Sequence, residues 1–170
     1  MYFLESERLS LRMFCEDDLP AYRQMHSHPE VCQWFGDGQP LDRITTWRNV
    51  TAILGHWQLR GYGLWGVEEK ATGELIGRVG FHNPDGWPGL ELGWTLARHK
   101  WGQGFATEAA RLCLEHGFSQ FGFDHVISLI RPDNHRSIAV AERIGEQLEG
   151  ETDLLGKRVL VYGISRDDAD

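Results

Sequence analysis

A basic run followed by a glycine-rich loop stands in the middle of an otherwise acidic chain. Residues 98–100 read RHK and residues 101–107 read WGQGFAT, whereas the whole chain has a formal net charge of −8. Small residues at Gly102, Gly104 and Ala106 allow several backbone N–H groups to point at one anion. A helix that begins there adds unpaired amides and the positive end of its dipole. The chemistry predicted for this loop is binding of a negatively charged group.

Two kinds of nucleotide-binding loop do not fit this pattern. A P-loop requires Gly-Lys-Ser/Thr at its end, and the chain has no such sequence. A dinucleotide-binding loop would use Gly102 and Gly104, with Asp124 as the acid that binds the ribose. However, Thr107 occupies the place of the third glycine, and Asp124 precedes the next expected strand. Both interpretations are therefore disfavoured.

Residues 101–109, WGQGFATEA, resemble the acyl-CoA loop of the GCN5-related N-acetyltransferases (GNAT). The family pattern is Gln or Arg, two free positions, Gly, one free position, then Gly or Ala. Here Trp101 stands in the first place, Gly104 is the required glycine and Ala106 is the small residue. Trp departs from the general family but is typical of the branch that resembles the RimJ/RimL ribosomal-protein N-terminal acetyltransferases. Residues 4–31 and 131–145 extend the resemblance over nearly the whole chain.

The resemblance implies one domain over residues 1–170 with the acyl-CoA N-acyltransferase fold. This fold is α/β (α+β), with a mixed central sheet of about seven strands, splayed strands 4 and 5, and about four flanking helices. The implied co-substrate is acetyl-CoA, with its pantetheine arm between the splayed strands and its pyrophosphate on the loop amides. The implied cofactor-binding residues are Trp94, Thr95, Leu96, Arg98, His99, Lys100, Trp101, Gly102, Gln103, Gly104, Phe105, Ala106, Thr107, Asn134, Arg136 and Ser137.

Acetyl transfer to an amine also needs a group that takes the proton of the amine. Glu91 lies early in the expected strand 90–96 and faces away from Leu90 and Leu92, toward either the substrate cleft or solvent. A partly desolvated carboxylate there could accept the proton directly or through water. His82 is the rival base, because imidazole titrates near neutrality. The choice between them stays open.

A second catalytic need is a partner for the departing thiolate. The wider family often places a tyrosine seven residues after the asparagine of its second signature, and this chain has Ala141 there. The resemblance leaves Ser137 as the hydroxyl near the thiol, able to hydrogen-bond the sulfur or to act through water. Asn134 is expected to cap its helix and to position pantetheine. Glu146 replaces the Phe of the family's Gly-Phe pair, which we expect to affect packing more than chemistry.

Alternating strands and helices must position these residues. Strands are expected at 8–14, 62–68, 74–83, 90–96, 124–130, 147–153 and 158–164, and helices from about residue 17 and at 41–59, 104–120 and 134–144. The alternation of Leu9 and Leu11 indicates a half-buried strand, and Gly61 ends the helix 41–59. Within the helix 104–120, Glu108 is spaced to pair with Arg111.

Composition restricts the class of protein. With 170 residues, 41% apolar content, no apolar run near twenty residues and no apolar leader, we expect a cytoplasmic protein with no membrane partner. The three scattered cysteines argue against disulfides and thiolate metal sites. His26, His28 and Glu30 have metal-like spacing but no further ligand cluster, so no metal is expected. The chain has no positive stripe for nucleic acid.

These observations predict an acetyl-CoA-dependent N-acetyltransferase that transfers the acetyl group directly in a ternary complex. No cysteine stands in a motif position, so a covalent acyl-enzyme is not favoured. One alternative is a non-catalytic acyl-CoA-binding domain that senses the ligand or binds a partner. The acceptor stays open between a protein N-terminus and a small-molecule amine, and the oligomeric state between monomer and homodimer.

Overall fold

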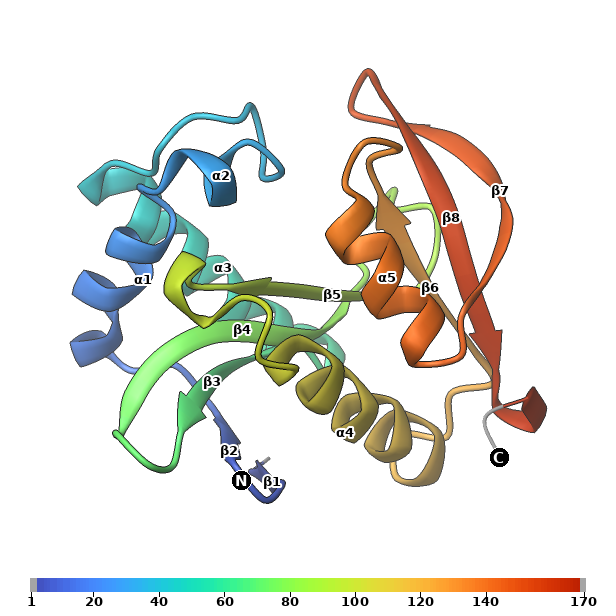
Figure 1. The fold of residues 1–170 in the computed structure, drawn as a ribbon, viewed down its shortest axis with the longest axis horizontal. Coiled ribbons are helices and arrows are strands. Elements are labelled where there is room, and N and C mark those ends of the chain that lie inside the picture. The colour runs from blue at the N-terminus through green and yellow to red at the C-terminus, as the bar shows by residue number, and fades with distance from the viewer. Residues whose placement is uncertain (1–2, 169–170) are drawn as a thin grey trace.

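The structure, a computed structural model, describes residues 3–168, in which five α-helices surround an eight-stranded sheet (Figure 1). The strands are β1 (Leu4–Glu5), β2 (Leu9–Arg12), β3 (Leu64–Glu69), β4 (Glu74–His82), β5 (Glu91–Leu96), β6 (His125–Ile130), β7 (Gln147–Leu154) and β8 (Lys157–Ser165). The helices are α1 (Leu19–Met25), α2 (Pro29–Cys32), α3 (Arg43–Arg60), α4 (Phe105–Ser119) and α5 (His135–Arg143), with short 3-10 turns at Glu16–Asp18, Arg98–Lys100 and Arg166–Asp168.

The predicted α/β class is confirmed, and each predicted strand and each fully bounded helix is present with ends that shift by at most two residues. Two elements raise the expected counts of about seven strands and four helices. Strand β1 pairs with β2 through Leu4↔Leu11 and Glu5↔Ser10, and α2 is a four-residue helix that starts at Pro29. Both are too short to produce a hydrophobic period. Because β1 precedes the first predicted strand, the predicted strands 4 and 5 are β5 and β6.

The sheet has the order β1-β2-β3-β4-β5-β6-β8-β7. Its neighbours are antiparallel except β5 and β6, which are parallel and share a single register pair, Glu91↔Ile127. Beyond that pair the two strands diverge, as Figure 1 shows. The predicted splay is thus confirmed, and it leaves backbone groups of β5 without partners in the sheet.

Consecutive side chains of β4 show which helices cover each face of the sheet. The ring of Phe81 packs against α4 so closely that a Cβ at Gly117 would lie 2.5 Å from Phe81 Cζ. The ring of the next residue, His82, stacks on His56 of α3 with centroids 5.4 Å apart. The α4 face is apolar, with Trp65, Phe81 and Leu92 fully buried, each contributing roughly 1.5–3 kcal/mol through burial. The α3 face is more polar.

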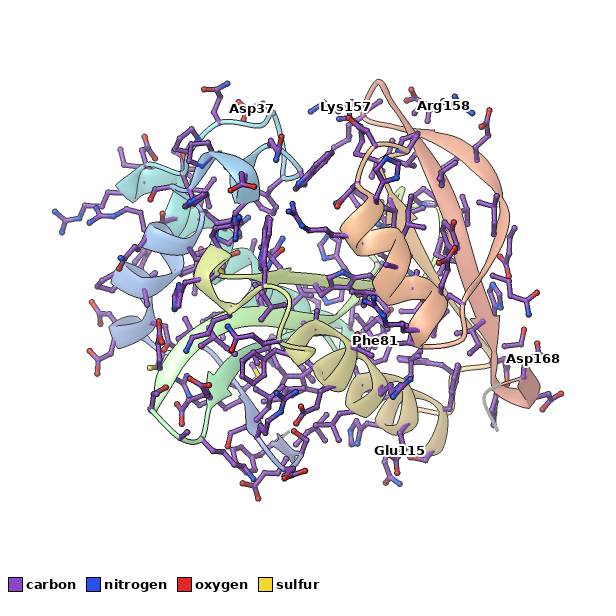
Figure 2. All side chains as sticks on the ribbon, viewed as in Figure 1. Asp37, Phe81, Glu115, Lys157, Arg158 and Asp168 are labelled. Carbon is purple, nitrogen blue, oxygen red and sulfur yellow. The ribbon has the colours of Figure 1, made fainter. Side chains whose placement is uncertain are left out.

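The β7–β8 hairpin reaches across to the segment after α2. Lys157, at the start of β8, donates from Nζ to the carbonyl of Gly36 at 2.6 Å, and Figure 2 shows Lys157 and Asp37 on the same side of the molecule. This contact joins two segments that are 121 residues apart. Over the described residues, the helices are either too short or too polar to cross a membrane.

Candidate active site

The glycine loop leads into the N-terminus of α4 in a conformation that suits glycine. Gly102 and Gly104 have φ values of 76° and 82°, in the left-handed region that disfavours other residues. Gly104 is the N-cap residue of α4, and no side chain of the described part of the chain caps this helix. Within residues 3–168, none of the six backbone N–H groups from Gly102 to Thr107 donates a hydrogen bond. Six consecutive amides without partners fit the oxygens of a phosphate or pyrophosphate.

The predicted basic run is paired with carboxylates from neighbouring elements. The contacts are Arg98 with Glu30 at 2.6 Å, His99 with Glu74 at 3.0 Å, and Lys100 with Glu69 at 2.7 Å. Lys100 borders the cleft described below, whereas Arg98 and His99 are not among its lining residues. These pairs attach the loop to α2, β3 and β4.

Trp101 anchors the start of the loop. Its indole Nε1 donates to the carbonyl of Leu96 at 2.9 Å, and its ring contacts the guanidinium groups of Arg98 and Arg136, each 4.9 Å from the ring centroid. Tryptophan at the family's Gln/Arg position therefore joins the end of β5 to α5. Gln103 holds the same turn, donating from Nε2 to the carbonyl of His99 at 2.9 Å.

Arg8 contacts the glycine loop, and the sequence analysis did not identify it. Its guanidinium lies 4.4 Å from the ring centroid of Phe105 and donates to the carbonyl of Gln103 at 3.0 Å. Glu108 pairs with Arg8, Nε to Oε2 at 2.7 Å, so the predicted pairing with Arg111 is wrong. Arg111 instead donates to the carbonyl of Arg143. Nearly one hundred residues separate Arg8 from the loop, so no local spacing could reveal this contact.

The main chain of β5 faces the gap that the splay opens. Ser128 Oγ donates to the carbonyl of Leu92 at 2.8 Å, which shows that Leu92 directs its backbone toward β6. Because consecutive residues of a strand direct their backbone groups to opposite edges, Trp94 and Leu96 direct their N–H groups the same way as Leu92, and Thr95 faces β4 opposite Arg78. Beyond the single β5–β6 pair, no strand within residues 3–168 pairs with the Trp94 amide.

Asn134 and Ser137 lie at the start of α5, on the far side of this gap. Asn134 caps the helix by accepting a hydrogen bond from the Ser137 amide at 3.3 Å, which confirms the predicted cap. Both residues border the cleft. Within residues 3–168 the Ser137 hydroxyl has no hydrogen-bond partner, so it is available to a ligand.

Glu91 lies at the point where β5 and β6 part. Its Oε2 accepts a hydrogen bond from Trp87 Nε1 at 2.7 Å. Burial raises the pKa of Glu91 to about 7, against the opposing effects of the Trp87 hydrogen bond and the charge of Arg78. The carboxyl group therefore exchanges its proton near neutral pH, as a general base requires.

His82 lies directly across the sheet from Glu91, in the register pair His82↔Glu91. Its ring is packed between His56 and Trp87, with centroids 5.4 and 5.0 Å away. Burial, with smaller effects from the charges of His56 and Arg78, lowers the pKa of His82 to about 4. His82 is therefore neutral at pH 7, and no carboxylate among the described residues orients it.

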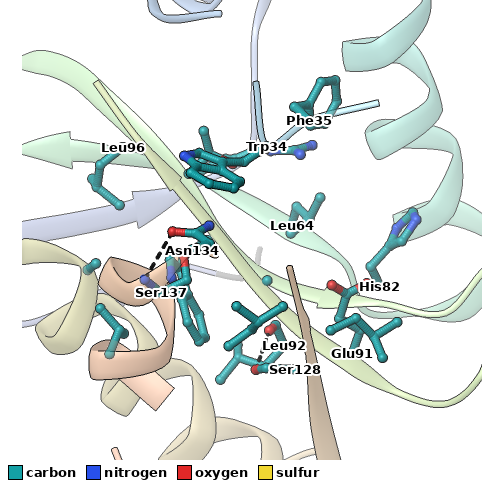
Figure 3. A pocket seen from close by; sticks show the side chains of 18 of the residues that line it. Trp34, Phe35, Leu64, His82, Glu91, Leu92, Leu96, Ser128, Asn134 and Ser137 are labelled. Atoms are coloured by element: carbon teal, nitrogen blue, oxygen red, sulfur yellow. Dashed lines mark hydrogen bonds between the residues drawn. The ribbon is translucent and has the colours of Figure 1, made fainter. Parts of the chain in front are cut away.

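A cleft of about 1750 Å³ brings these groups together. Glu91, His82, Asn134 and Ser137 all border it, as do Gly104, Ala106 and Thr107 of the loop. In Figure 3, Glu91 lies beside His82 and Asn134 beside Ser137, on opposite sides of Leu92. A Cβ at Gly93 would meet only Glu91 Oε1, at 3.8 Å, so the floor is open next to the carboxylate.

Known proteins are similar to this chain in sequence and in fold. The family model for the Acetyltransferase (GNAT) domain matches residues 8–147. The chain belongs to the GNAT acetyltransferase family. It is 30% identical over 152 residues, 88% of this chain and 85% of the relative, to the uncharacterized N-acetyltransferase p20 of Bacillus licheniformis. The crystal structure of an acetyltransferase from Agrobacterium tumefaciens str. C58 is 34% identical, with a TM-score of 0.86 over 98% of this chain and 95% of that one.

A structure of RimL, the ribosomal L7/L12 alpha-N-protein acetyltransferase in complex with coenzyme A, has a TM-score of 0.80 at 22% identity, covering 99% of this chain and 100% of that one. At this identity the likeness concerns the fold. Membership makes this chain an acetyl-CoA-dependent N-acetyltransferase, which confirms the predicted enzyme class. The six unpaired loop amides and the splayed strand fit the anionic and amide groups of that co-substrate.

Proposed function

We propose that this GNAT enzyme transfers the acetyl group of acetyl-CoA directly to a primary amine, with Glu91 as the group that takes the proton of the amine. The observation that carries this proposal is the position of Glu91. A partly buried carboxyl group with a pKa of about 7 borders an open floor at Gly93, where the splay begins. An amine placed over Gly93 would lie next to Glu91 and near the gap that receives the thioester.

The backbone supplies the donor side of the reaction. The amides from Gly102 to Thr107 would bind the pyrophosphate, and the Trp94 N–H in the gap is suited to the pantetheine arm or to the thioester oxygen as it gains charge. One preorganised donor of this kind typically contributes about 3 kcal/mol to acyl transfer. Because these are main-chain groups, the fold itself provides them.

In the proposed step the amine nitrogen attacks the thioester carbonyl carbon, and the C–N bond forms as the C–S bond breaks. The proton of the amine passes to Glu91, directly or through water, and coenzyme A leaves as the thiolate. Ser137, whose hydroxyl has no partner among residues 3–168, would hydrogen-bond the sulfur or relay a proton to it through water. Ala141 at the family's tyrosine position provides no acid there.

The acceptor is a primary amine, either a protein N-terminus or a small molecule. Purified protein, acetyl-CoA and a panel of amines and short peptides test this, with free thiol and acetylated product as separate readouts. We expect thiol release that depends on the amine, matched by product of 42 Da greater mass. Absence of thiol release with every acceptor, together with absence of acetyl-CoA binding by calorimetry, would refute the proposal.

A further inference from the structure

Arg78 is a cation in the cleft that has no carboxylate within 4.0 Å among residues 3–168. The cations of the cofactor loop differ, because Arg8, Arg98 and Lys100 each pair with a glutamate. Arg78 is on β4 and only partly exposed. A partly desolvated guanidinium is costly unless an anion accompanies it.

The groups in closest contact with Arg78 are neutral, and the carboxyl group of Glu91, whose pKa its charge lowers, lies beyond 4.0 Å. Its guanidinium lies 4.5 Å from the ring centroid of Phe35, and Nε is 3.4 Å from Thr95 Oγ1. The hydroxyl of Tyr22 is also near Arg78. Burial raises the pKa of Tyr22, and the charge and hydrogen bonding of the neighbouring Arg78 oppose that rise. None of these groups supplies the negative charge that the arginine lacks.

Asn49 of α3 adds a second donor to the same place. Its Oδ1 accepts the hydroxyl of Tyr22, so its Nδ2 group points elsewhere and has no partner among the described residues. Asn49 and Arg78 both border the cleft and both approach the Tyr22 hydroxyl. A guanidinium without a carboxylate partner and an amide N–H₂ group without an acceptor, both among residues 3–168, form a suitable site for a carboxylate or phosphate.

The register of β4 and β5 relates this site to the proposed base. Every second pair of this ladder, His82↔Glu91, Gly80↔Gly93 and Arg78↔Thr95, lies on one face of the sheet, because alternate residues of a strand share a face. Arg78 is thus two residues, about 7 Å along the strand, from the pair that contains Gly93. The side-chain-free position at Gly93 lies between the carboxyl group of Glu91 and the guanidinium of Arg78.

We propose that the acceptor is an amine that also carries an anionic group, a carboxylate or a phosphate, and that Arg78 and Asn49 bind this group while the amine lies over Gly93. This inference rests on the proposed function and narrows it. An amino acid or an aminoalkyl phosphate can present both groups at such a spacing. A simple diamine cannot, since it has no anion to place at Arg78.

The test compares matched acceptors that differ only in the anion. Amino acids of increasing chain length are paired with their carboxamides, and aminoalkyl phosphates with the corresponding amino alcohols. We expect kcat/KM to favour the anionic member of at least one series by about tenfold or more, as one charged hydrogen bond would give. The two series distinguish a carboxylate from a phosphate ligand.

Arg78→Gln should abolish this preference, read as the ratio of kcat/KM between the two members of each pair. The ratio is the readout because loss of the Arg78 charge also raises the pKa of Glu91, which affects both members alike. Arg60→Gln is the matched control, because Arg60 also borders the cleft and lacks a carboxylate partner among residues 3–168 but is exposed on α3. The Arg60→Gln variant should keep the preference for the anionic acceptor. Asn49→Asp provides a second variant that does not depend on the folding of Arg78→Gln, and it should reverse the preference by placing a carboxylate at the site.

Neutral amines used as well as their anionic partners, or a preference unchanged by both Arg78→Gln and Asn49→Asp, would overturn the inference while the proposed function stands. Calorimetry of the same acceptor pairs with the coenzyme A-loaded protein covers the case of no turnover. Tighter binding of the anionic member would then support the site although acetyl transfer had failed. Equal binding would overturn it.

Discussion

Replacing Glu91 by Gln separates the two candidate bases. The change keeps the shape of the side chain and an oxygen for the hydrogen bond from Trp87, but it removes the ionisable group. In the wild type, burial places the pKa of Glu91 at about 7, so the proton-accepting carboxylate forms as the pH rises through 7. The acceptor kcat/KM should rise over that range and level off above it.

If His82 were the base, the pH dependence of kcat/KM would differ. The pKa of His82 is lowered to about 4, so its proton-accepting form is already complete well below pH 7. A base at His82 would therefore give an inflection near pH 4. The position of the inflection and its response to mutation identify the residue.

A positioned general base contributes about 10²- to 10⁴-fold to the rate, so Glu91→Gln should lower kcat by that factor and remove the inflection near pH 7. Initial rates of thiol release between pH 5 and 9 measure this. Two acceptors whose amines have different pKa values separate the enzyme group from the ionisation of the substrate. Binding of acetyl-CoA, measured by calorimetry, should be unchanged because the loop amides are untouched.

His82→Gln serves as the control for a packing change at the same place. It should keep the inflection near pH 7 and lose less than about tenfold in kcat. If Glu91→Gln retains that inflection, or loses no more activity than His82→Gln, Glu91 is not the base.

The same carboxyl group makes a prediction about stability. Its pKa rises from 4.5 in the unfolded chain to about 7 in the fold, so the folded state loses stability as the pH rises through that interval, by at most about 3 kcal/mol. Glu91→Gln should therefore be more stable than the wild type above pH 7, with the difference vanishing below about pH 4.5. Urea unfolding at pH 4.5, 6 and 8 measures it.

Three further substitutions test the loop, the floor and the buried acid. Gly104→Ala forces alanine into left-handed backbone at φ 82°, which costs about 1–2 kcal/mol. We expect the affinity for coenzyme A, measured by calorimetry, to be about five- to thirty-fold weaker. The control is Gly122→Ala, at φ 70° and with no atom within 4 Å of the new Cβ, which should lose similar stability but bind coenzyme A normally. Gly93→Ala should fold, because its Cβ would meet only Glu91 Oε1, at 3.8 Å. The new methyl group should displace the amine and so lower the acceptor kcat/KM by about 10²-fold. Binding of coenzyme A should be unchanged. Burial raises the pKa of Glu146 to about 8, so the folded wild-type protein loses stability as the pH rises from 4.5 through 8. Thermal unfolding should therefore show Glu146→Gln to be more stable than the wild type at pH 9 and equal to it near pH 4.5.

The parts of the fold that sequence predicted well are those with local causes. Gly61 ends α3 with φ 78°, and Asn134 caps α5 through its own side chain. The glycine loop needs only small residues and a helix after it. Each of these features depends on a few consecutive residues, so spacing and residue type are sufficient to find it.

The parts that sequence did not predict depend on contacts between distant segments. Arg8 reaches the glycine loop across 95 residues. The surroundings of Arg78 come from α1, α3 and the segment at Phe35, whose packing no local pattern encodes. The side of the sheet that Glu91 faces stayed open for the same reason, because alternation separates two faces but does not say which helices cover them.

The buried acid at Glu146 has a structural explanation in the splay itself. Where β5 leaves β6, the carbonyl of Leu92 accepts the hydroxyl of Ser128 at 2.8 Å, and the same hydroxyl oxygen lies 2.9 Å from Glu146 Oε1. A hydroxyl has one proton, so if Ser128 donates it to Leu92, the second contact requires a proton on Glu146. The raised pKa of Glu146, caused by burial, agrees with a neutral carboxyl group. The chain of Glu146, Ser128 and Leu92 thus satisfies the carbonyl at the point of divergence and leaves the next inward amide, that of Trp94, for the co-substrate.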